Sequence, residues 1–542
     1  MKIAFLNLPW AGDKKNPCLW GVRAGSRWPH FQQRPPGHKL PRYVPFPFFL
    51  ATAAAFARNC GHDVVLIDSV AEPSSFESVL ERLYSFGPQL VFAETSTPSL
   101  ENDISLLLKI KKAFPEVLTV CAGSHSPHFA LKLMKKEKFP DFWIAGEYDF
   151  AAAELASKLE KGEPPPEGVF TPSSKSVPPF ASVKDLDALP EPLFESLPMA
   201  NYSDPVCGLP SPSAQSFLSR GCPFKCSFCV WPQVIYGSRS YRTRCVTKAL
   251  DEVETLINIY KCESFYFDDD TANIGEKRMK TLSSEIIRRG LNIYPWAMMA
   301  RADCMTDSML ENLASAGLYA VKYGVESVSP ALTDACGKNT CLEKFRKAVS
   351  KTKALGIKMH LTFTFGLPGE TPETIAQTLD FAIETAPESA QFSICTPFPG
   401  TDFFDECTKN NWLLSSDWKK FTGNGCDAVI STPSLSASKL LDSYALAMEK
   451  WNSFISRRTQ KRKDTLVAKI KNEITRGAKW KFLGDKDFAD FIFNDSTLNS
   501  ALAPDAPLTV IVSRHDEEKI YRCILRNTPS LKPEKILRLY VS

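Results

Sequence analysis

The sequence lacks the uninterrupted run of about eighteen apolar residues that a membrane-spanning helix needs. It also lacks the long apolar region and the small-residue cleavage site of a signal peptide, because residues 1–9, MKIAFLNLP, predict a short buried strand instead. These two absences argue against a transmembrane segment and against secretion. We therefore expect a cytoplasmic protein.

The sequence also lacks a large excess of charge of either sign. The 65 Lys and Arg residues and the 61 Asp and Glu residues leave a net charge of +4, which is too small to indicate a nucleic-acid partner. Without a secretion signal, the 16 cysteines favour reduced thiols or metal ligands over a disulfide framework. We interpret the cysteines that stand alone as small buried side chains. They include Cys18, Cys60, Cys121, Cys304 and Cys523.

The chain does have a globular composition, 44% apolar and 23% charged, and its 542 residues are enough for several domains. Residues 1–165 alternate short apolar runs with amphipathic stretches of helical period. The apolar runs are 2–8, 63–68, 89–94, 117–122 and 141–145, and the helical stretches are 46–60, 75–86, 101–114, 127–137 and 148–160. This alternation predicts an α/β domain with a doubly wound, Rossmann-like parallel sheet, whose ligands bind at the carboxyl ends of the strands.

A long segment without this alternation, residues 20–47, follows the first strand. We expect it to be irregular, and irregular segments of this length in compact domains are usually functional or disordered. Two arginines, Arg23 and Arg27, stand beside Trp20 and Trp28. That combination indicates a recognition surface for an anion or for a substrate.

The rest of the chain divides into three further regions. Residues 166–213 are rich in proline, which prevents regular structure and predicts an extended linker. Residues 214–430 predict a partial (β/α)6 barrel with its chemistry at the carboxyl ends of the strands. Residues 431–542 predict a mostly helical, basic extension that ends as strand–helix–strand over 507–542. The expected barrel strands are 215–219, 263–268, 292–299, 318–324, 358–365 and 390–395, and the expected barrel helices are 247–260, 276–289, 306–316, 342–354 and 372–385.

The basic charge of the extension fits a solvated helix face, and an anionic substrate or a membrane surface is the alternative.

A cysteine motif follows the first barrel strand, where residues 219–229 read SRGCPFKCSFC. Cys222, Cys226 and Cys229 have the spacing to give three thiolates to one cubane iron–sulfur cluster. The next cysteine is Cys245, beyond a basic stretch, so one iron is expected to stay open for a substrate. A zinc knuckle and a chance spacing are the alternatives, and neither explains why the motif lies at the catalytic rim of a barrel.

This motif resembles the signature of the radical S-adenosylmethionine (SAM) superfamily, and the resemblance extends over residues 214–405. It implies a 4Fe-4S cluster whose open iron chelates SAM. It also implies that one electron cleaves SAM to methionine and a 5′-deoxyadenosyl radical, which abstracts hydrogen from the substrate. A reductase, ferredoxin or flavodoxin would donate that electron. The implied SAM contacts are Phe228, Asp270, Arg301, Glu326 and Gly366.

Several of these rim residues have structural alternatives. Asp270 lies in FDDDT, where an aspartate could receive the SAM ammonium or cap the next helix. Arg301 could pair with a carboxylate. Gly366 begins GLPGET, which is also an ordinary turn before a helix. The segment TPFPGT at 396–401 matches a family segment for which the sequence gives no role.

A doubly wound domain directly before such a barrel resembles the cobalamin-dependent subgroup of the superfamily. Gly123-Ser124-His125 follows the fourth strand, where the subgroup often has Gly-Gly-x-His, although the Cβ of Ser124 makes close approach to a corrin harder. No Asp-x-His-x-x-Gly motif is present, which is usual for the subgroup. The implied cobalamin contacts are Thr95, Ser96, Gly123, Ser124, His125, Gly146 and Glu147. Residues 94–97, Glu-Thr-Ser-Thr, end the third strand and could line a polar cofactor or cap the next helix. Trp231 and Tyr236 could shape the cavity. A domain that has kept the fold without the cofactor is the alternative.

The resemblance implies a class B radical SAM methyltransferase, which methylates an unactivated carbon of a small-molecule or lipid-like substrate. In that family methylcobalamin supplies the methyl group and a second SAM restores it. Three alternatives stay open: a ring-forming or oxidative radical SAM enzyme, a carbon–carbon coupling enzyme, and a non-catalytic iron–sulfur protein.

Overall fold

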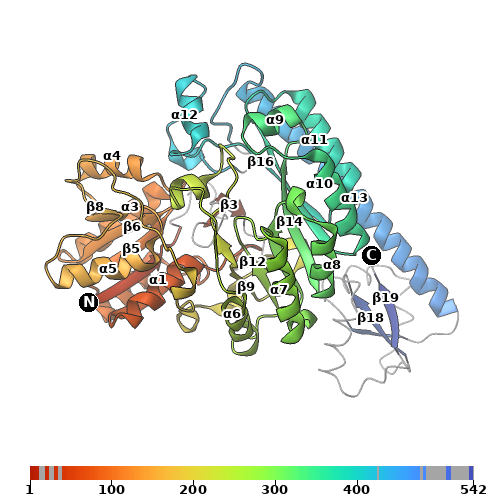
Figure 1. Cartoon of the computed structure of the whole chain (residues 1–542), viewed down its shortest axis with the longest axis horizontal. Helices are drawn as coiled ribbons and strands as arrows, with labels where there is room; N and C mark the ends of the chain where they lie inside the picture. The colour runs from red at the N-terminus through yellow and green to blue at the C-terminus, as the bar shows by residue number, and fades with distance from the viewer. Residues whose placement is uncertain are drawn as a thin grey trace. The chain divides into compact units, whose positions relative to one another are not determined.

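The structure is a computed structural model of the chain with two compact units, residues 1–445 and residues 446–542 (Figure 1). It describes residues 1–10, 19–22, 30–33, 40–423, 427–475, 480–483, 508–513 and 536–540.

A six-stranded sheet opens the first unit, with the strand order β4-β1-β5-β6-β7-β8. The first five strands in this order are parallel, and only β8 runs antiparallel to its neighbour β7. The order reverses beside β1, which is where doubly wound sheets open a crevice for a ligand. The expected strands are therefore confirmed, with small shifts at their ends. Their bounds are β1 Lys2–Asn7, β4 Asp63–Asp68, β5 Leu90–Thr95, β6 Leu118–Gly123, β7 Phe142–Ile144 and β8 Val169–Phe170.

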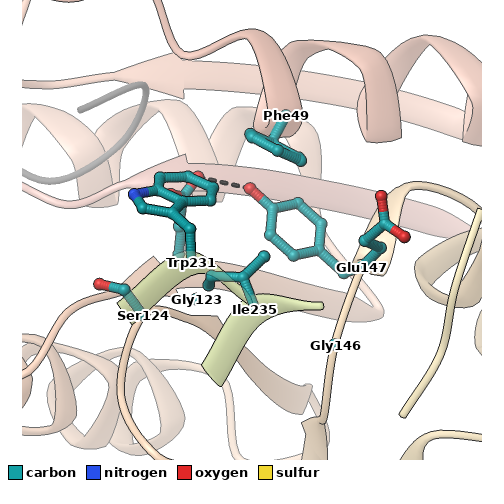
Figure 2. A pocket seen from close by; sticks show the side chains of 9 residues that line it. Phe49, Gly123, Ser124, Gly146, Glu147, Trp231 and Ile235 are labelled. Carbon is teal, nitrogen blue, oxygen red and sulfur yellow. Dashed lines mark hydrogen bonds between the residues drawn. The ribbon is translucent and has the colours of Figure 1, made fainter. Parts of the chain in front are cut away.

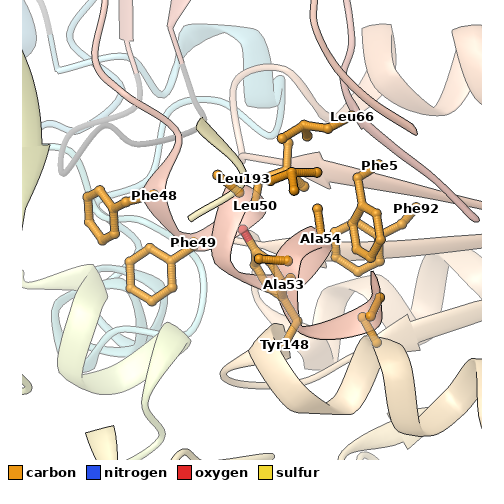
Figure 3. Packing of buried hydrophobic residues seen from close by; sticks show 14 of the residues in the cluster. Phe5, Phe48, Phe49, Leu50, Ala53, Ala54, Leu66, Phe92, Tyr148 and Leu193 are labelled. Carbon is orange, nitrogen blue, oxygen red and sulfur yellow. The ribbon is translucent and has the colours of Figure 1, made fainter. Parts of the chain in front are cut away.

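Helices cover both faces of this sheet because successive strand residues point to opposite sides. On β1, Ile3 and Phe5 join the core cluster that contains α1 and α5, and Ala4 and Leu6 join the cluster that contains α2, α3 and α4. Figure 3 shows the first cluster, with Ala54 of α1 close to the rings of Phe5 and Phe92. The doubly wound prediction is confirmed. The helices are α1 Phe48–Asn59, α2 Phe76–Phe86, α3 Leu100–Ala113, α4 Pro127–Glu137 and α5 Tyr148–Glu160.

The insertion after β1 is more regular than expected. Two short strands, β2 Leu19–Val22 and β3 His30–Gln33, pair in antiparallel fashion within the segment predicted to be irregular. Arg23, Arg27 and the ring of Trp28 lie outside the described residues, as does the side chain of Trp20. The predicted recognition surface therefore stays a prediction.

The proline-rich connector, residues 166–213, contributes side chains to the hydrophobic core of the N-terminal domain. It contains four 3-10 turns, and its side chains Leu193, Phe194 and Tyr202 belong to the same cluster as α1 and Phe217. Phe46 holds Tyr202 edge-on at 5.2 Å between ring centroids. The turns are η1 Leu186–Ala188, η2 Phe194–Ser196, η3 Met199–Asn201 and η4 Val206–Gly208.

A second six-stranded sheet is wholly parallel, and its strands lie in chain order from β9 to β16. Six strand–helix units in this order form a curled half-barrel, which confirms the barrel prediction. The strands are β9 Ser213–Ser216, β12 Ser264–Phe267, β13 Trp296–Ala300, β14 Leu318–Glu326, β15 Lys358–Phe365 and β16 Ser389–Ile394. The helices are α6 Val246–Asn258, α7 Glu276–Arg288, α8 Asp307–Ser315, α9 Pro330–Ala335, α10 Leu342–Ala354, α11 Pro372–Thr385 and α12 Asp402–Lys409.

The end of the chain combines one long helix with short strands. Helix α13 spans Ala437–Thr475, within the region 431–542 that was predicted to be mostly helical. Strands β17 Trp480–Leu483, β18 Leu508–Ser513 and β19 Ile536–Tyr540 form a parallel sheet, so the extension also contains β structure. The helix expected between the last two strands lies outside the described residues. Among the described helices, none is long and apolar enough to span a membrane.

Candidate active site

The cysteine loop is closed at its base by a two-stranded ribbon. The strand expected over 215–219 ends early, and β10 Ser219–Arg220 pairs in antiparallel fashion with β11 Arg242–Thr243. Gly221 has a φ of +89°, and a Cβ there would lie 1.8 Å from the carbonyl oxygen of Ser240. Only glycine fits where the two arms of the loop pass this closely.

The cysteine loop has little regular secondary structure, and hydrogen bonds from side chains stabilise it instead. The amide of Gln233 donates to the carbonyls of Ser227, at 3.0 Å, and Cys229, at 2.8 Å. Arg239 Nη1 donates to Phe224 O at 2.8 Å. Because backbone carbonyls that are shielded from water need partners, these contacts fix the conformation of the loop.

The three predicted cluster thiols lie within electrostatic reach of one another. Burial raises the pKa of Cys226 and, more strongly, that of Cys229, and the other two thiols of the motif raise the pKa of Cys229 further. Lys338 and Arg301 pull the pKa of Cys226 down. In the described part of the chain no three His, Cys, Asp or Glu side chains form a single-ion site. In a cubane cluster each thiolate would bind an iron of its own.

The cysteines outside the motif vary in exposure. Cys245 is exposed at the start of α6, where its thiol meets the Thr247 hydroxyl. Cys121 is buried as expected. Cys60 is exposed, so the expectation that it is buried was wrong, because it caps the end of α1 on the solvent side. Cys304 is half-buried. Cys18 and Cys523 lie outside the described residues.

The aspartates after β12 brace the backbone that leads into the motif. Asp270 Oδ2 accepts from Gly221 N at 2.8 Å, and Asp269 accepts from Leu218 N at 3.0 Å. The N-cap of the following helix α7 is Gly275, so capping this helix is not the role of Asp270. The predicted SAM contact at Asp270 is thus placed directly beside the cysteine loop.

Arg301 and Glu326 also lie around Cys226. The Arg301 guanidinium forks onto Asp303 at 2.9 and 2.6 Å and lies 3.7 Å above the ring of Phe224. Glu326 accepts from Lys338 Nζ at 2.9 Å and has the unusual φ of +64°. Non-glycine residues in this region of φ/ψ space often mark functional sites.

The two remaining predicted SAM contacts are Phe228 and Gly366, and each also has a role in local packing or in a turn. Phe228 is buried in an apolar cluster with Phe403 and Phe404. Gly366 has a φ of +95° and donates its N–H to the carboxylate of Glu370. Burial raises the pKa of Glu370 to about 8.

The segment TPFPGT at 396–401 has a structural role that the sequence alone does not give. It leads into α12, where Asp402 N donates to Gln233 Oε1 at 2.7 Å and Phe403 N donates to Ser227 O at 3.1 Å. A Cβ on Gly400 would lie 2.8 Å from the Ser126 hydroxyl. The segment therefore ties the end of the barrel both to the cysteine loop and to the residues after β6.

A pocket of about 330 Å³ opens at the carboxyl ends of β5, β6 and β7 (Figure 2). Four of the predicted cobalamin contacts line it, namely Gly123, Ser124, Gly146 and Glu147. A further part of its wall comes from η5 Trp231–Ile235, the π-helix that follows the cysteine motif. The pocket is thus shared between the N-terminal domain and the π-helix that follows the cysteine loop.

The three other predicted cobalamin contacts do not line this pocket. Thr95 donates to Asp103 Oδ2 at 2.8 Å, and Ser96 N donates to the Ser99 hydroxyl at 3.1 Å, so both belong to the start of α3. His125 packs edge-on against Trp418 at 5.7 Å between ring centroids. Burial lowers the pKa of His125 to about 3, which keeps its imidazole neutral.

Three residues that line the pocket, Phe49, Tyr148 and Ile235, were not predicted from the sequence. Tyr148 donates to Glu94 Oε2 at 2.5 Å, and the ring of Phe49 stacks on Trp231 at 5.5 Å with 26° between the planes. Ile235 is the third. Tyr148 directly follows Gly146-Glu147, so its place at a strand end could have indicated it. Phe49 lies in the first turn of a helix and carries no such signal.

Comparisons with known proteins agree with this geometry. The sequence profile of the Radical SAM superfamily matches residues 216–382. The "Uncharacterized methyltransferase PH0819" of Pyrococcus horikoshii is 31% identical over 384 residues, which are 69% of this chain and 81% of that protein. The chain belongs to the radical SAM superfamily.

Two further proteins extend the comparison of this radical SAM enzyme. The anaerobic magnesium-protoporphyrin IX monomethyl ester cyclase of Rubrivivax gelatinosus is 28% identical over 382 residues, which are 66% of each protein. The radical SAM methyltransferase TsrM of Kitasatospora setae, solved with tryptophan and a SAM analogue, has a TM-score of 0.57 at 19% identity, over 69% of this chain and 74% of TsrM. Another TsrM structure holds cobalamin and a [4Fe-4S] cluster.

Proposed function

We propose that this enzyme is a cobalamin-dependent radical SAM methyltransferase that methylates an unactivated carbon of a small-molecule or lipid-like substrate. Cys222, Cys226 and Cys229 would hold the 4Fe-4S cluster, and the pocket at the carboxyl ends of β5–β7 would hold cobalamin. The observation that carries the proposal is the shared wall of that pocket, because Trp231 lies two residues after Cys229. One wall of the pocket therefore belongs to η5, the short helix that follows the cluster loop.

The residues around the motif fit an iron–sulfur cluster. The cations Lys338 and Arg301 favour the thiolate of Cys226, the form that binds iron. Phe228 and its apolar cluster keep water from one side of the loop. When bound, the cluster supplies the electron that cleaves SAM, and cobalamin carries the methyl group. Asp270 and Glu326 place carboxylates beside the loop, where the ammonium of SAM would be received.

Two residues of the pocket lining suit the edge of a corrin. Glu94 can accept a hydrogen bond from an amide side chain of cobalamin, and Trp231 offers an apolar face. The space of about 330 Å³ is smaller than a whole cobalamin and is partly open to solvent. Glycine is required at positions 123 and 146 by the backbone alone. A Cβ on Gly123 would lie 2.0 Å from Thr95 O, and one on Gly146 would lie 2.3 Å from Ala181 O.

The test is anaerobic reconstitution of the whole chain with iron, sulfide and hydroxocobalamin. We expect about four irons per chain and retained corrinoid after gel filtration. Glu94→Gln should weaken corrinoid retention and leave the iron content unchanged. A folded protein that binds iron and retains no corrinoid would contradict the cobalamin part of the proposal and leave the radical SAM part standing.

A ring-forming reaction is the second candidate, because the Rubrivivax relative is named a cyclase. Both reactions need an external electron to reduce the cluster. We propose a cytoplasmic reductase, ferredoxin or flavodoxin as the donor of that electron. The two candidates differ in the fate of SAM. Methyl transfer through cobalamin releases S-adenosylhomocysteine, which a cyclase has no need to make.

A further inference from the structure

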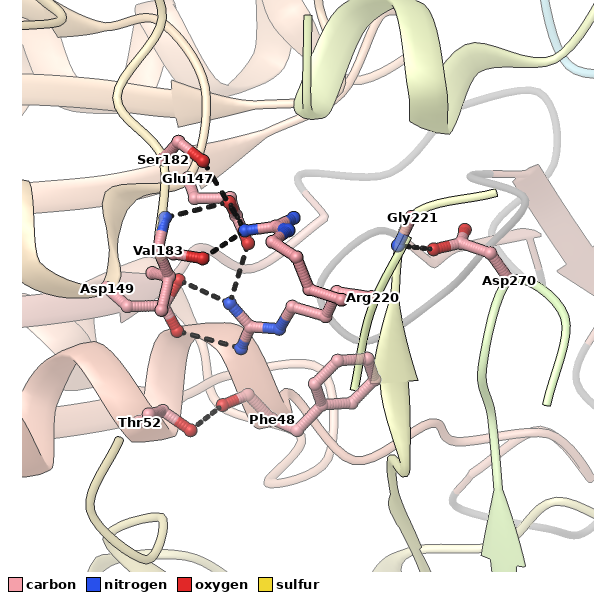
Figure 4. A network of polar contacts seen from close by, with 10 residues as sticks. Phe48, Thr52, Glu147, Asp149, Ser182, Val183, Arg220, Gly221 and Asp270 are labelled. Atoms are coloured by element: carbon pink, nitrogen blue, oxygen red, sulfur yellow. Dashed lines mark hydrogen bonds and ion pairs between the residues drawn. The ribbon is translucent and has the colours of Figure 1, made fainter. Parts of the chain in front are cut away.

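A buried cluster of charges joins the base of the cysteine loop to the pocket. Arg220 lies on β10 directly before Gly221, and its guanidinium forks onto Asp149 at 2.8 and 2.9 Å. Its Nη1 also donates to Glu147 Oε1 at 3.1 Å. The side chains of all three residues are at most 1% exposed. Figure 4 shows Arg220 reaching both carboxylates on one side of the ribbon while Gly221 bonds to Asp270 on the other.

The second strand of the ribbon holds the same carboxylate. Arg242 is the register partner of Arg220, and its Nη1 donates to Glu147 Oε2 at 2.6 Å and to Val183 O. Val183 N donates to Glu147 Oε2 at 2.9 Å. Both strands that enclose the cysteine loop are therefore clamped onto one glutamate, and that glutamate lines the pocket.

A second contact links Arg220 to the pocket wall. Its guanidinium lies 4.1 Å above the ring of Phe49 and 4.6 Å from that of Phe217. Phe49 lines the pocket and stacks on Trp231. Arg220 thus touches two residues of the pocket, Glu147 and Phe49, and precedes the first cluster cysteine by a single glycine.

Buried ion pairs are not an efficient source of stability, because apolar residues of similar volume often stabilise a core as well or better. A bidentate arginine fork does fix distance and orientation. We propose that Arg220, with Glu147, Asp149 and Arg242, is the positioning element that sets the cluster loop relative to the pocket. The inference rests on the proposed function, since it concerns the separation of two cofactors that the proposal places there.

The test compares Arg220→Lys and Asp149→Asn with the wild type and with Arg244→Lys. Lysine at position 220 keeps the charge and loses the fork. Arg244 is a matched control, because it is also buried, pairs with Glu252 at 2.7 Å and packs 5.0 Å from Phe217 without lining the pocket. Each protein is reconstituted with iron, sulfide and hydroxocobalamin and then reduced, so that cluster and cobalt are both paramagnetic.

The primary readout is the spin–spin interaction between the reduced cluster and cob(II)alamin, measured by electron paramagnetic resonance. We expect the interaction in the wild type and in Arg244→Lys, and its loss or a changed splitting in Arg220→Lys and Asp149→Asn at unchanged iron content. The same splitting in all four proteins would overturn the inference. A wild type that binds no corrinoid would instead count against the proposed function.

Amide hydrogen exchange of the proteins without cofactors tests the same inference independently of the proposed function. Both network variants should exchange faster than the wild type at residues 221–229 and at 145–149 together. Arg244→Lys should leave both segments protected. Faster exchange at only one of the two segments would show that Arg220 does not couple them, and would overturn the inference.

Discussion

At the scale of single residues, we propose that the thiols of Cys222, Cys226 and Cys229 bind the cluster and that the other cysteines do not. Changing Cys222, Cys226 and Cys229 together to alanine should abolish iron uptake, because no other described residues offer three thiolates in one loop. Cys245→Ala should keep about four irons per chain. The measurement is iron and sulfide content with the visible absorbance of the anaerobically reconstituted proteins. Full iron content in the triple variant would contradict the assignment.

Glu370 gives a second prediction at this scale, through pH. Burial raises its pKa from 4.5 to about 8, so the folded protein holds a proton that the unfolded chain has released. A raised carboxyl pKa means that stability is complete below pH 4.5 and falls as the pH rises towards 8. The slope through this window should be about 1.4 kcal/mol per pH unit for one proton.

The check is denaturant unfolding of wild type and Glu370→Gln between pH 5 and pH 9. Glutamine can still accept from the N–H groups of Gly366 and Leu367, as the carboxylate does. The variant should therefore gain stability relative to the wild type as the pH rises. Parallel curves for the two proteins would show that Glu370 does not titrate in this window.

At the scale of elements, the short ribbon of β10 and β11 closes the base of the cysteine loop. Gly221→Ala should open the ribbon, because the new Cβ would overlap the carbonyl oxygen of Ser240 at 1.8 Å. Gly290→Ala is the matched control, with a φ of +69° and no heavy atom within 4 Å of the new Cβ. We expect Gly290→Ala to lose about 1–2 kcal/mol from left-handed strain alone.

The Gly221→Ala protein should lose more stability than this, and most of its iron as well. Thermal melting and iron content of the two variants check the prediction. Equal stability loss and equal iron content would mean that the close approach at Gly221 is not required for the cluster loop.

The long elements were predictable, and the short ones that build the site were not. Period-2 and period-3.6 patterns indicated the strands and helices of both sheets, since each buries a continuous apolar face. The ribbon β10–β11 has two residues in each strand, too few for a pattern. Asp270 was expected beside SAM or at a helix cap, and its bond to Gly221 N could not be read from spacing because it joins residues far apart in the chain.

The pocket shows the same limit. Gly123 and Gly146 follow strands, so their place at the sheet edge was predictable, and both line it. His125 also follows a strand, but tertiary packing against Trp418 removes it from the pocket. Phe49 reaches the pocket from a helix, because the fold brings α1 against η5.

At the scale of the whole molecule, the N-terminal domain and the connector share one core. We expect a fragment of residues 1–165 to fold alone and to bind hydroxocobalamin. The core cluster of α1 and α5 includes Leu193, Phe194 and Tyr202 of the connector, so a fragment of residues 1–213 should melt at higher temperature than 1–165. Circular dichroism melts and hydroxocobalamin retention of both fragments test this. Equal melting temperatures would mean that the connector adds no core to the domain.

The most direct test of the whole account is the fate of SAM on the intact enzyme loaded with iron, sulfide and cobalamin and supplied with a reductant. We predict two products, 5′-deoxyadenosine from the cluster and S-adenosylhomocysteine from methyl transfer to cobalt. Cys226→Ala should lose the deoxyadenosine. Deoxyadenosine without S-adenosylhomocysteine, from an enzyme that converts its true substrate, would contradict the methyltransferase and favour a ring-forming or coupling reaction. Formation of neither product by the fully loaded enzyme would contradict the account as a whole.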